Sequence, residues 1–167
     1  MMDKVNKLVL KVILVLLCIV VSCQITFAEV NTVKIYLDSI IPEEINHVGN
    51  EWHFTITINE KKIEKEINLL KDNREIYKFQ EEMYQTKINK PDQVVHITLC
   101  VIDDDPVHDD KSTKKKDVLL HTIGESHTKI VEINVKVYEK HGNFRGNSAR
   151  WKFNFVFHYA FEEENDM

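Results

Sequence analysis

The amino-acid sequence predicts an all-β protein, an antiparallel β-sandwich of seven to eight strands that follows an N-terminal export segment. Aromatic and β-branched residues alternate with polar ones over several stretches, which is the period of a strand with one buried face. Short polar segments separate these stretches, as expected where antiparallel strands reverse direction. The 167 residues, 43% of them hydrophobic, are enough for one domain with a real core.

The first 28 residues have the composition of a secretory signal peptide. Three lysines precede an uncharged apolar run at residues 12–21, which is shorter than the roughly 20 residues that a membrane-spanning helix needs. Cleavage after Ala28 would release a soluble protein. A lipobox ending at Cys23 would instead leave the protein lipid-anchored, and an uncleaved anchor is a third possibility. We expect a secreted or extracytoplasmic protein whose mature, cleaved chain has no transmembrane span.

Removal of residues 1–28 takes away three lysines and one aspartate. This leaves 19 basic against 26 acidic residues, a net charge of −7 with histidine neutral. Nucleic-acid binders need a basic surface, so the balance argues against nucleic acid and favours a cation or a basic partner. The mature domain keeps Cys100 without a second cysteine to form a disulfide framework, and we expect Cys100 to be a small buried hydrophobe.

Strands are expected in the following order along the mature chain. Residues 32–39 and 52–58 alternate apolar and polar side chains. The clearest alternation is in residues 151–161, where every second residue is aromatic. Further strands are expected at residues 94–102, 118–123 and 129–139.

The middle of the chain, residues 60–85, is ambiguous. Ile63, Ile67 and Leu70 have helical spacing, whereas residues 61–70 and 74–82 also have the character of two strands joined by a turn. The β-rich flanks favour two strands. We therefore predict one sandwich domain over residues 29–162, followed by a flexible acidic tail at residues 163–167.

The stretch VIDDDPVHDDKSTKKKD, residues 101–117, concentrates charge as no other part of the sequence does. Because one strand is expected to end at residue 102 and the next to begin at residue 118, the stretch is predicted to be a loop at one end of the sandwich. Ca²⁺ binds six to eight oxygen ligands, so several of these carboxylates could hold it. The alternative is a solvated acidic turn whose lysines offset the aspartates.

Two other kinds of metal site do not match this stretch. An EF-hand loop counted from Asp103 requires Gly and Glu where His108 and Lys114 stand. Zinc is not expected, because His108 has neither a cysteine pair nor a second histidine at ligand spacing.

The segment VIDDDP, which follows the apolar strand HITLC, resembles the third top loop of C2 domains. Residues 36–58 are similar to the earlier loop of that family, with Asp38 after a strand and Glu51 where the next strand starts. The resemblance implies a C2-like, eight-stranded antiparallel β-sandwich with Ca²⁺ as its cofactor. The metal ligands it implies are Asp38, Glu44, Glu51, Asp103, Asp105, Asp109 and Asp110.

Two of the implied ligand positions have several candidates. Position 111 is Lys where the family's closing aspartate is expected, so that ligand is Asp109, Asp110 or Asp117. The second ligand of the first loop is one of Glu43, Glu44 and Asn50.

The C2 resemblance implies a non-catalytic binding module that engages anionic phospholipid or a protein through loops at one end of the sandwich. Ile40, Ile41 and Val107 are the apolar loop residues that would enter the interface. No G-x-S-x-G, H-E-x-x-H or P-loop motif occurs, so we do not expect an enzyme.

A second function class remains open, a metal-free secreted or lipid-anchored domain that recognises protein or glycan. It is favoured by residues 139–151, a connection rich in Gly and Asn that contains Phe144, Arg145 and Arg150. An extended loop with basic and aromatic residues is a reasonable contact surface, although most loops of this kind only connect strands.

Overall fold

The computed structural model describes residues 30–45, 48–69, 76–90, 92–104, 109–121, 126–141 and 145–162. They form β1 (Val30–Ile45), β2 (Glu51–Ile58), β3 (Lys61–Asn68), β4 (Tyr77–Ile88), β5 (Val94–Asp103), β6 (Asp110–Leu119), β7 (His127–Tyr138) and β8 (Ser148–Glu162). The predicted export segment and acidic tail lie outside these residues. None of the described residues forms a helix that is long and apolar enough to cross a membrane.

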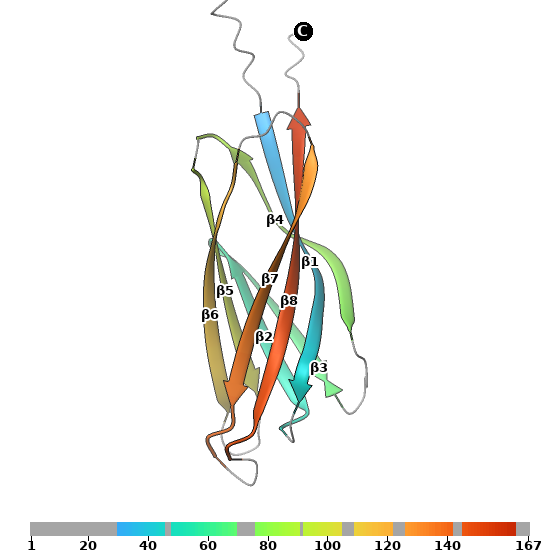
Figure 1. Cartoon of the computed structure of the whole chain (residues 1–167), viewed down its shortest axis with the longest axis vertical. Coiled ribbons are helices and arrows are strands. Elements are labelled where there is room, and N and C mark those ends of the chain that lie inside the picture. The colour runs from blue at the N-terminus through green and yellow to red at the C-terminus, as the bar shows by residue number, and fades with distance from the viewer. Residues whose placement is uncertain are drawn as a thin grey trace, which may run out of the picture. The chain divides into compact units, whose positions relative to one another are not determined.

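The eight strands form two packed layers (Figure 1). The first sheet has the order β4-β1-β8-β7 and the second has the order β3-β2-β5-β6. Strand neighbours such as β7 with β8 and β5 with β6 are antiparallel. The predicted eight-stranded antiparallel β-sandwich is confirmed, and so are the strands expected at residues 52–58, 94–102, 129–139 and 151–161. The two strands expected in the ambiguous middle are β3 and β4.

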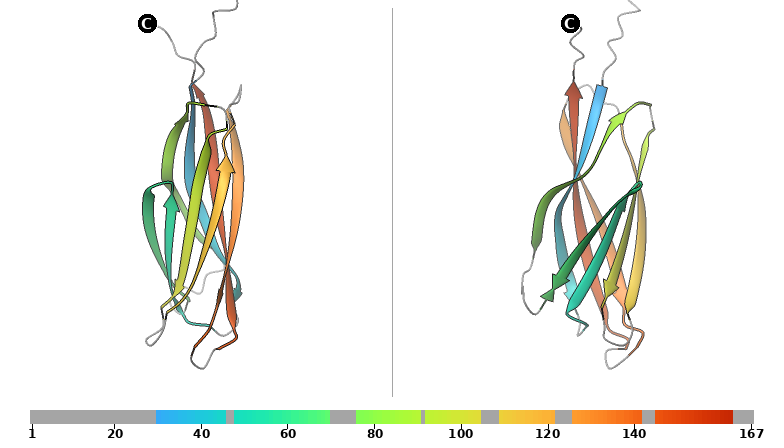
Figure 2. Two further views of the ribbon diagram at one scale, coloured as in Figure 1. Left: turned by 90° about the vertical axis from the view of Figure 1, so that its left-hand side faces the viewer. Right: turned by 180° about the vertical axis from the view of Figure 1, so that it is seen from behind.

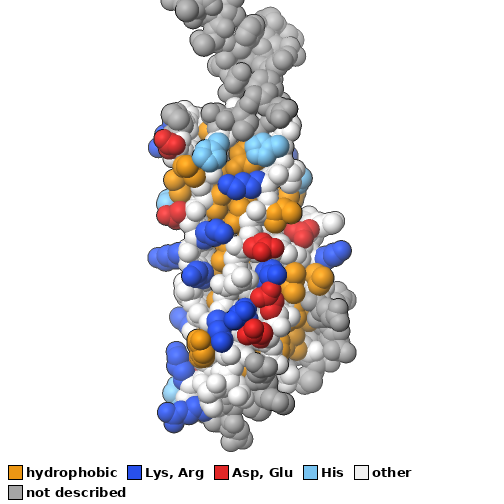
Figure 3. All heavy atoms as spheres, in the orientation of Figure 1, with side chains coloured by type: hydrophobic (Ala, Val, Ile, Leu, Met, Phe, Trp, Pro, Cys, Tyr) orange, Lys and Arg blue, Asp and Glu red, His pale blue; other side chains and the backbone are white. Residues whose placement is uncertain are grey.

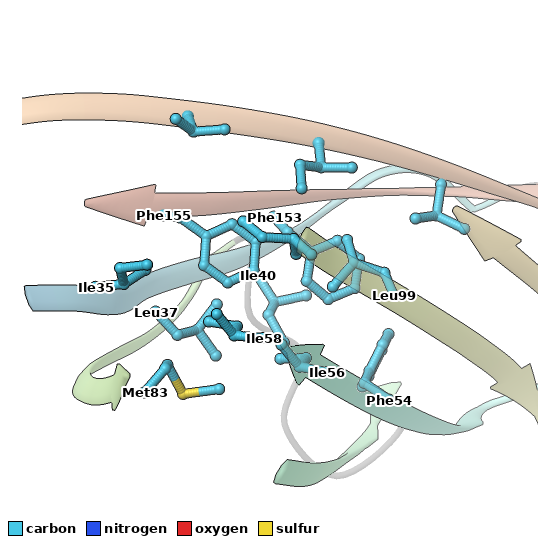
Figure 4. Packing of buried hydrophobic residues seen from close by; sticks show 14 of the residues in the cluster. Ile35, Leu37, Ile40, Phe54, Ile56, Ile58, Met83, Leu99, Phe153 and Phe155 are labelled. Carbon is cyan, nitrogen blue, oxygen red and sulfur yellow. The ribbon is translucent and has the colours of Figure 1, made fainter. Parts of the chain in front are cut away.

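The core lies between the two sheets and follows from the period-two patterns. Phe153 and Phe155 of β8 are fully buried and face apolar residues of the opposite sheet (Figure 4). The ring of Trp151 lies 5.1 Å from that of Trp52 and 4.9 Å from that of Phe54, both in β2. Burying one such side chain stabilises the fold by about 1.5–3 kcal/mol. The aromatic row of β8 therefore joins the two layers.

The prediction of a loop after Asp38 is wrong, because β1 continues to Ile45. Ile40 is fully buried in the core, so it is not a loop residue that could enter a membrane. The strand continues because β4 adapts to it: the register shifts between Leu37 and Ser39, and Gln80 has a φ of 51°. Such bulges bend a strand without ending its pairing. Asp38 thus lies in the middle of a strand.

The prediction that residues 103–117 form one loop is also wrong. Only residues 104–109 connect β5 to β6, and the strand expected to begin at residue 118 begins at Asp110. β6 lies at the edge of its sheet, where lysines on both faces remain in solvent and protect the strand from unwanted pairing. It therefore has no apolar alternation by which it could be recognised. Cys100, expected to be buried, is half-buried and points outward from β5.

Candidate functional site

Two buried carboxylates lie at the end of the sandwich where β5 passes into β6. Asp103, the last residue of β5, has 0% of its surface exposed, and Asp110, the first residue of β6, has 2%. The two residues are direct partners in the β5–β6 register. Buried carboxylates need hydrogen-bond donors, and both have one from the backbone of another connection.

Asp103 holds the connection between β1 and β2. Its Oδ2 accepts a hydrogen bond from the backbone N–H of Gly49 at 3.0 Å, and Trp52 Nε1 donates to the carbonyl of Gly49 at 2.9 Å. A Cβ on residue 49 would lie 2.8 Å from Asp103 Cγ and closer still to Oδ1. The connection therefore needs glycine where the carboxylate meets the backbone.

Asp110 holds the connection between β7 and β8 in the same way. Its Oδ2 accepts a hydrogen bond from the backbone N–H of Lys140 at 2.9 Å. The neighbouring Glu139 is buried, and its carbonyl accepts from the N–H of Gly146 at 2.9 Å. Sequence reasoning missed Glu139, because no pattern in the sequence marks a glutamate at the end of a strand as buried.

Asp104 and Glu51 line a shallow hollow of about 470 Å³ beside β2 and β3. His53 Nε2 lies 3.0 Å from Asp104 Oδ2, and its Nδ1 lies 3.3 Å from Glu66 Oε1. Glu51 Oε1 accepts a hydrogen bond from Asn68 Nδ2 at 2.9 Å. Each of these carboxylates therefore has a partner within the protein.

The glutamates predicted for the first loop form ion pairs with β8. Glu44 Oε1 lies 3.2 Å from Arg150 Nη1, and Glu43 Oε1 lies 2.6 Å from Lys152 Nζ. The hydrogen bond that Lys152 donates to Glu43, together with the negative charge of Glu43, raises the pKa of Lys152. Arg150 therefore belongs to a strand and to an ion pair, and not to the exposed loop predicted for it; Phe144 of that loop lies outside the described residues.

Two further predicted ligands lie far from Asp103. Asp38 accepts a hydrogen bond from Ser39 Oγ at 3.0 Å, and seven residues of strand separate it from the end of β1, roughly 20 Å. Asp117 lies opposite His96, with 2.8 Å between its Oδ1 and His96 Nδ1. Because Asp110 and Asp117 lie seven residues apart on β6, Asp117 is also roughly 20 Å from Asp103.

Asp103 and Asp110 lie opposite each other, but no third described member of the predicted calcium site joins them in a metal-binding group. Asp109 is exposed, Asp103 and Asp110 bind backbone amides, and Asp105 and Val107 lie outside the described residues. Among the residues that the structure describes, no three His, Cys, Asp or Glu side chains come together in a group that could hold a metal ion. The described side chains alone therefore do not supply the several oxygens, directed at one point, that Ca²⁺ requires.

A second surface lies along one side of the sandwich, where the edge strands β6 and β7 of the two sheets run next to each other (Figure 2, left). We call it the open side. It contains a hollow of about 680 Å³ lined by residues 116–119 of β6 and 129–132 of β7. Ile130 is 65% exposed and Leu119 is 37% exposed at its two borders.

Lysines are concentrated on the open side (Figure 3). The strands β6 and β7 carry Lys111, Lys114, Lys115, Lys116, Lys129 and Lys136. Within the described part of the chain, none of these six has a carboxylate within 4.0 Å, and the same holds for Lys61, Lys78, Lys87 and Lys90, whereas Lys34, Lys62, Lys65, Lys152 and Arg150 form ion pairs. The sequence suggested that the lysines offset the aspartates of the same stretch, but none of them forms an ion pair with a described aspartate of that stretch.

The direction of the side chains makes the interior of the hollow basic. Lys116 belongs to the same row of β6 as the buried Val118, and Lys129 belongs to the same row of β7 as the buried Val131, so both point inward. Asp117 and Glu132 belong to the opposite rows and point to the outer faces. The two acidic residues of the lining therefore do not neutralise the lysines inside it.

No family model matches this chain, and no curated protein sequence matches it either. Among solved structures, the chain is similar to a C2 domain of a plant extended synaptotagmin 1, with 13% sequence identity and a TM-score of 0.39. The match covers 81% of this chain and 97% of that domain. A similarity of this size carries no inference about ligands or partners.

Proposed function

We propose that this protein is an exported, non-catalytic binding module that engages an acidic protein partner through the open side, without calcium. The observation that carries the proposal is the row of lysines without carboxylate partners along the described strands β6 and β7. Cations of this kind remain available for the carboxylates of another molecule, and they accelerate its association. Export rests on the composition of residues 1–28.

A protein partner fits the open side better than a membrane surface does. Leu119 and Ile130 belong to outward rows on different sheets, so they border the hollow from opposite faces of the sandwich. A flat bilayer would reach only one of them at a time. A polypeptide that lies along the hollow could contact both.

Calcium-dependent binding through the acidic end is the competing function. It would need carboxylates free to leave their present partners, and Asp103 and Asp110 are buried against backbone amides. Moving either one would leave a backbone N–H without its acceptor, at a cost of about 1–3 kcal/mol. Binding on the open side does not require a buried carboxylate to move.

The experiment measures retention of the purified protein on polyglutamate resin in EDTA and in calcium. We expect equal retention in both, and about tenfold weaker binding for the double variant Lys114→Glu/Lys116→Glu, the equivalent of about 1.4 kcal/mol. The matched control is Lys78→Glu/Lys87→Glu, which changes two exposed lysines on the edge strand β4 of the other side.

Two results would contradict the proposal. One is retention that appears only with calcium, which would favour the acidic end. The other is an equal loss in both double variants, which would show a response to net charge alone. Vesicles containing phosphatidylserine, tested in parallel, should bind less of the protein than the resin does.

A further inference from the structure

We propose that the partner's acidic segment binds as an added strand beside β7, in extended conformation, with acidic and apolar residues alternating along it. This inference deepens the proposed function and rests on it. β7 is the last strand of its sheet, and β6, its neighbour across the hollow, is the last strand of the other sheet. The free edge of β7 therefore borders the hollow that residues 116–119 and 129–132 line.

The backbone of β7 has hydrogen-bonding groups directed at this space. Lys116 Nζ donates a hydrogen bond to the backbone carbonyl of Glu132 at 2.9 Å across the hollow, so this carbonyl points away from β8. The N–H and C=O of one strand residue point to the same side, and the direction alternates along the strand. Ile130, Glu132 and Asn134 therefore present their backbone groups at the free edge.

The side chains around the hollow select the sequence of the added strand. Inward-pointing residues of the partner would meet Lys116 and Lys129, and carboxylates are the groups that pair with them. Outward-pointing residues would lie beside Ile130, whose exposed surface favours an apolar neighbour. Glu132 on the same outward row repels acidic residues there. Acidic residues on the inward row of the partner and apolar residues on its outward row therefore alternate along the added strand.

Lys116 acts as a gate for this edge. In the structure its ammonium group donates a hydrogen bond to the backbone carbonyl of Glu132. This hydrogen bond protects the edge of β7 from pairing with arbitrary chains. An added strand has to displace it, and a strand without carboxylates would leave the lysine confined without a partner, which is unfavourable. Lys116 thus makes the exposed edge of β7 selective for acidic segments.

The hollow sets the length of the contact. It is lined by four consecutive residues of β7, which span about 13 Å of extended strand. A short peptide is therefore a sufficient probe. Because strand pairing uses every second backbone amide of the peptide, only one of its two alternating sets of N–H groups is required.

The test measures fluorescence anisotropy of labelled peptides with the full chain in EDTA. The probe is Glu-Val-Glu-Val-Glu-Val-Glu, and the control contains the same residues as a block of glutamates followed by a block of valines. We expect the alternating peptide to bind about tenfold more tightly. Two versions with N-methyl groups on the glutamate or on the valine amides should differ, one retaining binding and the other losing it.

The outcomes separate this inference from the proposed function. Equal affinity of the alternating and block peptides, with both weakened by Lys114→Glu/Lys116→Glu, would overturn strand addition and leave the basic open side as the binding surface. Equal loss with both N-methylated peptides would likewise overturn it. Failure of every peptide and of the polyglutamate resin would contradict the proposed function itself. The matched control for Lys114→Glu/Lys116→Glu is Lys87→Glu, which should still bind the alternating peptide.

Discussion

The carboxylate of Asp103 accepts a hydrogen bond at 3.0 Å from the backbone N–H of Gly49, which lies 54 residues earlier in the chain. The contact joins the end of β5 to the connection between β1 and β2. Asp110 makes the equivalent contact with Lys140 at 2.9 Å. Part of the acidic stretch that suggests a cation site in the sequence therefore holds the connections at one end of the sandwich together.

Replacement of Asp103 by alanine should lower the free energy of unfolding by about 2–3 kcal/mol, because the partly buried N–H of Gly49 would lose a charged acceptor. Asp103→Asn retains an acceptor oxygen and should cost less. Urea unfolding monitored by tryptophan fluorescence measures both. A change within about 0.5 kcal/mol for the alanine variant would show that the contact does not contribute to stability.

Gly49→Ala should destabilise the protein by at least about 1–3 kcal/mol, because the new Cβ would overlap the carboxylate of Asp103. Gly146→Ala gives the cost of backbone strain without a clash, because that position has a φ of 94° and open space around it. In the double variant Gly49→Ala/Asp103→Ala the two losses should not add, because the clash disappears together with the carboxylate. Strict additivity would argue against direct contact between the two residues.

Asp110 and Asp109 differ in their surroundings although they are neighbours in the sequence. Asp110→Ala should cost about 1–3 kcal/mol because the N–H of Lys140 loses its acceptor. Asp109 is exposed, so Asp109→Ala should change stability by less than about 0.5 kcal/mol. Thermal unfolding of the two variants compares them directly, and equal losses would contradict this assignment of roles.

Burial raises the pKa of Tyr159 above its usual value of about 10. A folded-state pKa above the unfolded one contributes stability that is complete below about pH 10 and is lost as the pH rises through the folded value. Tyr159→Phe should remove this part of the alkaline destabilisation. Spectrophotometric titration of the phenolate should show one tyrosine fewer at the alkaline end in the variant. An unchanged titration curve would contradict the assignment.

The fold is predictable from the sequence where one face of a strand is buried. The alternation in residues 52–58 and 151–161 places Trp52, Phe54, Trp151 and Phe153 in the core, as the structure shows. Period-two patterns succeed there because burial imposes them. β6 has no such pattern, since its lysines are in solvent on both faces at the edge of the sheet, and its residues therefore resemble a loop in the sequence.

The candidate site is harder to predict for a related reason. Asp103 and Asp110 stand out in the sequence as part of an unusual charge cluster, but their partners are backbone amides of distant connections, Gly49 and Lys140. A sequence does not show which backbone groups a fold brings to a carboxylate. The open side depends on two edge strands from different sheets lying together, which again follows from topology and not from the local sequence.

The most direct test of the central claim is hydrogen–deuterium exchange of the full chain with and without polyglutamate, in EDTA. If the open side binds the acidic partner, amides of residues 110–119 and 127–138 should exchange more slowly in its presence. With the alternating peptide Glu-Val-Glu-Val-Glu-Val-Glu in place of polyglutamate, the edge-facing amides of Ile130 and Glu132 should be among those most protected. Protection confined to the connections around Gly49, Asp104 and Asp109, or protection that requires calcium, would contradict the account.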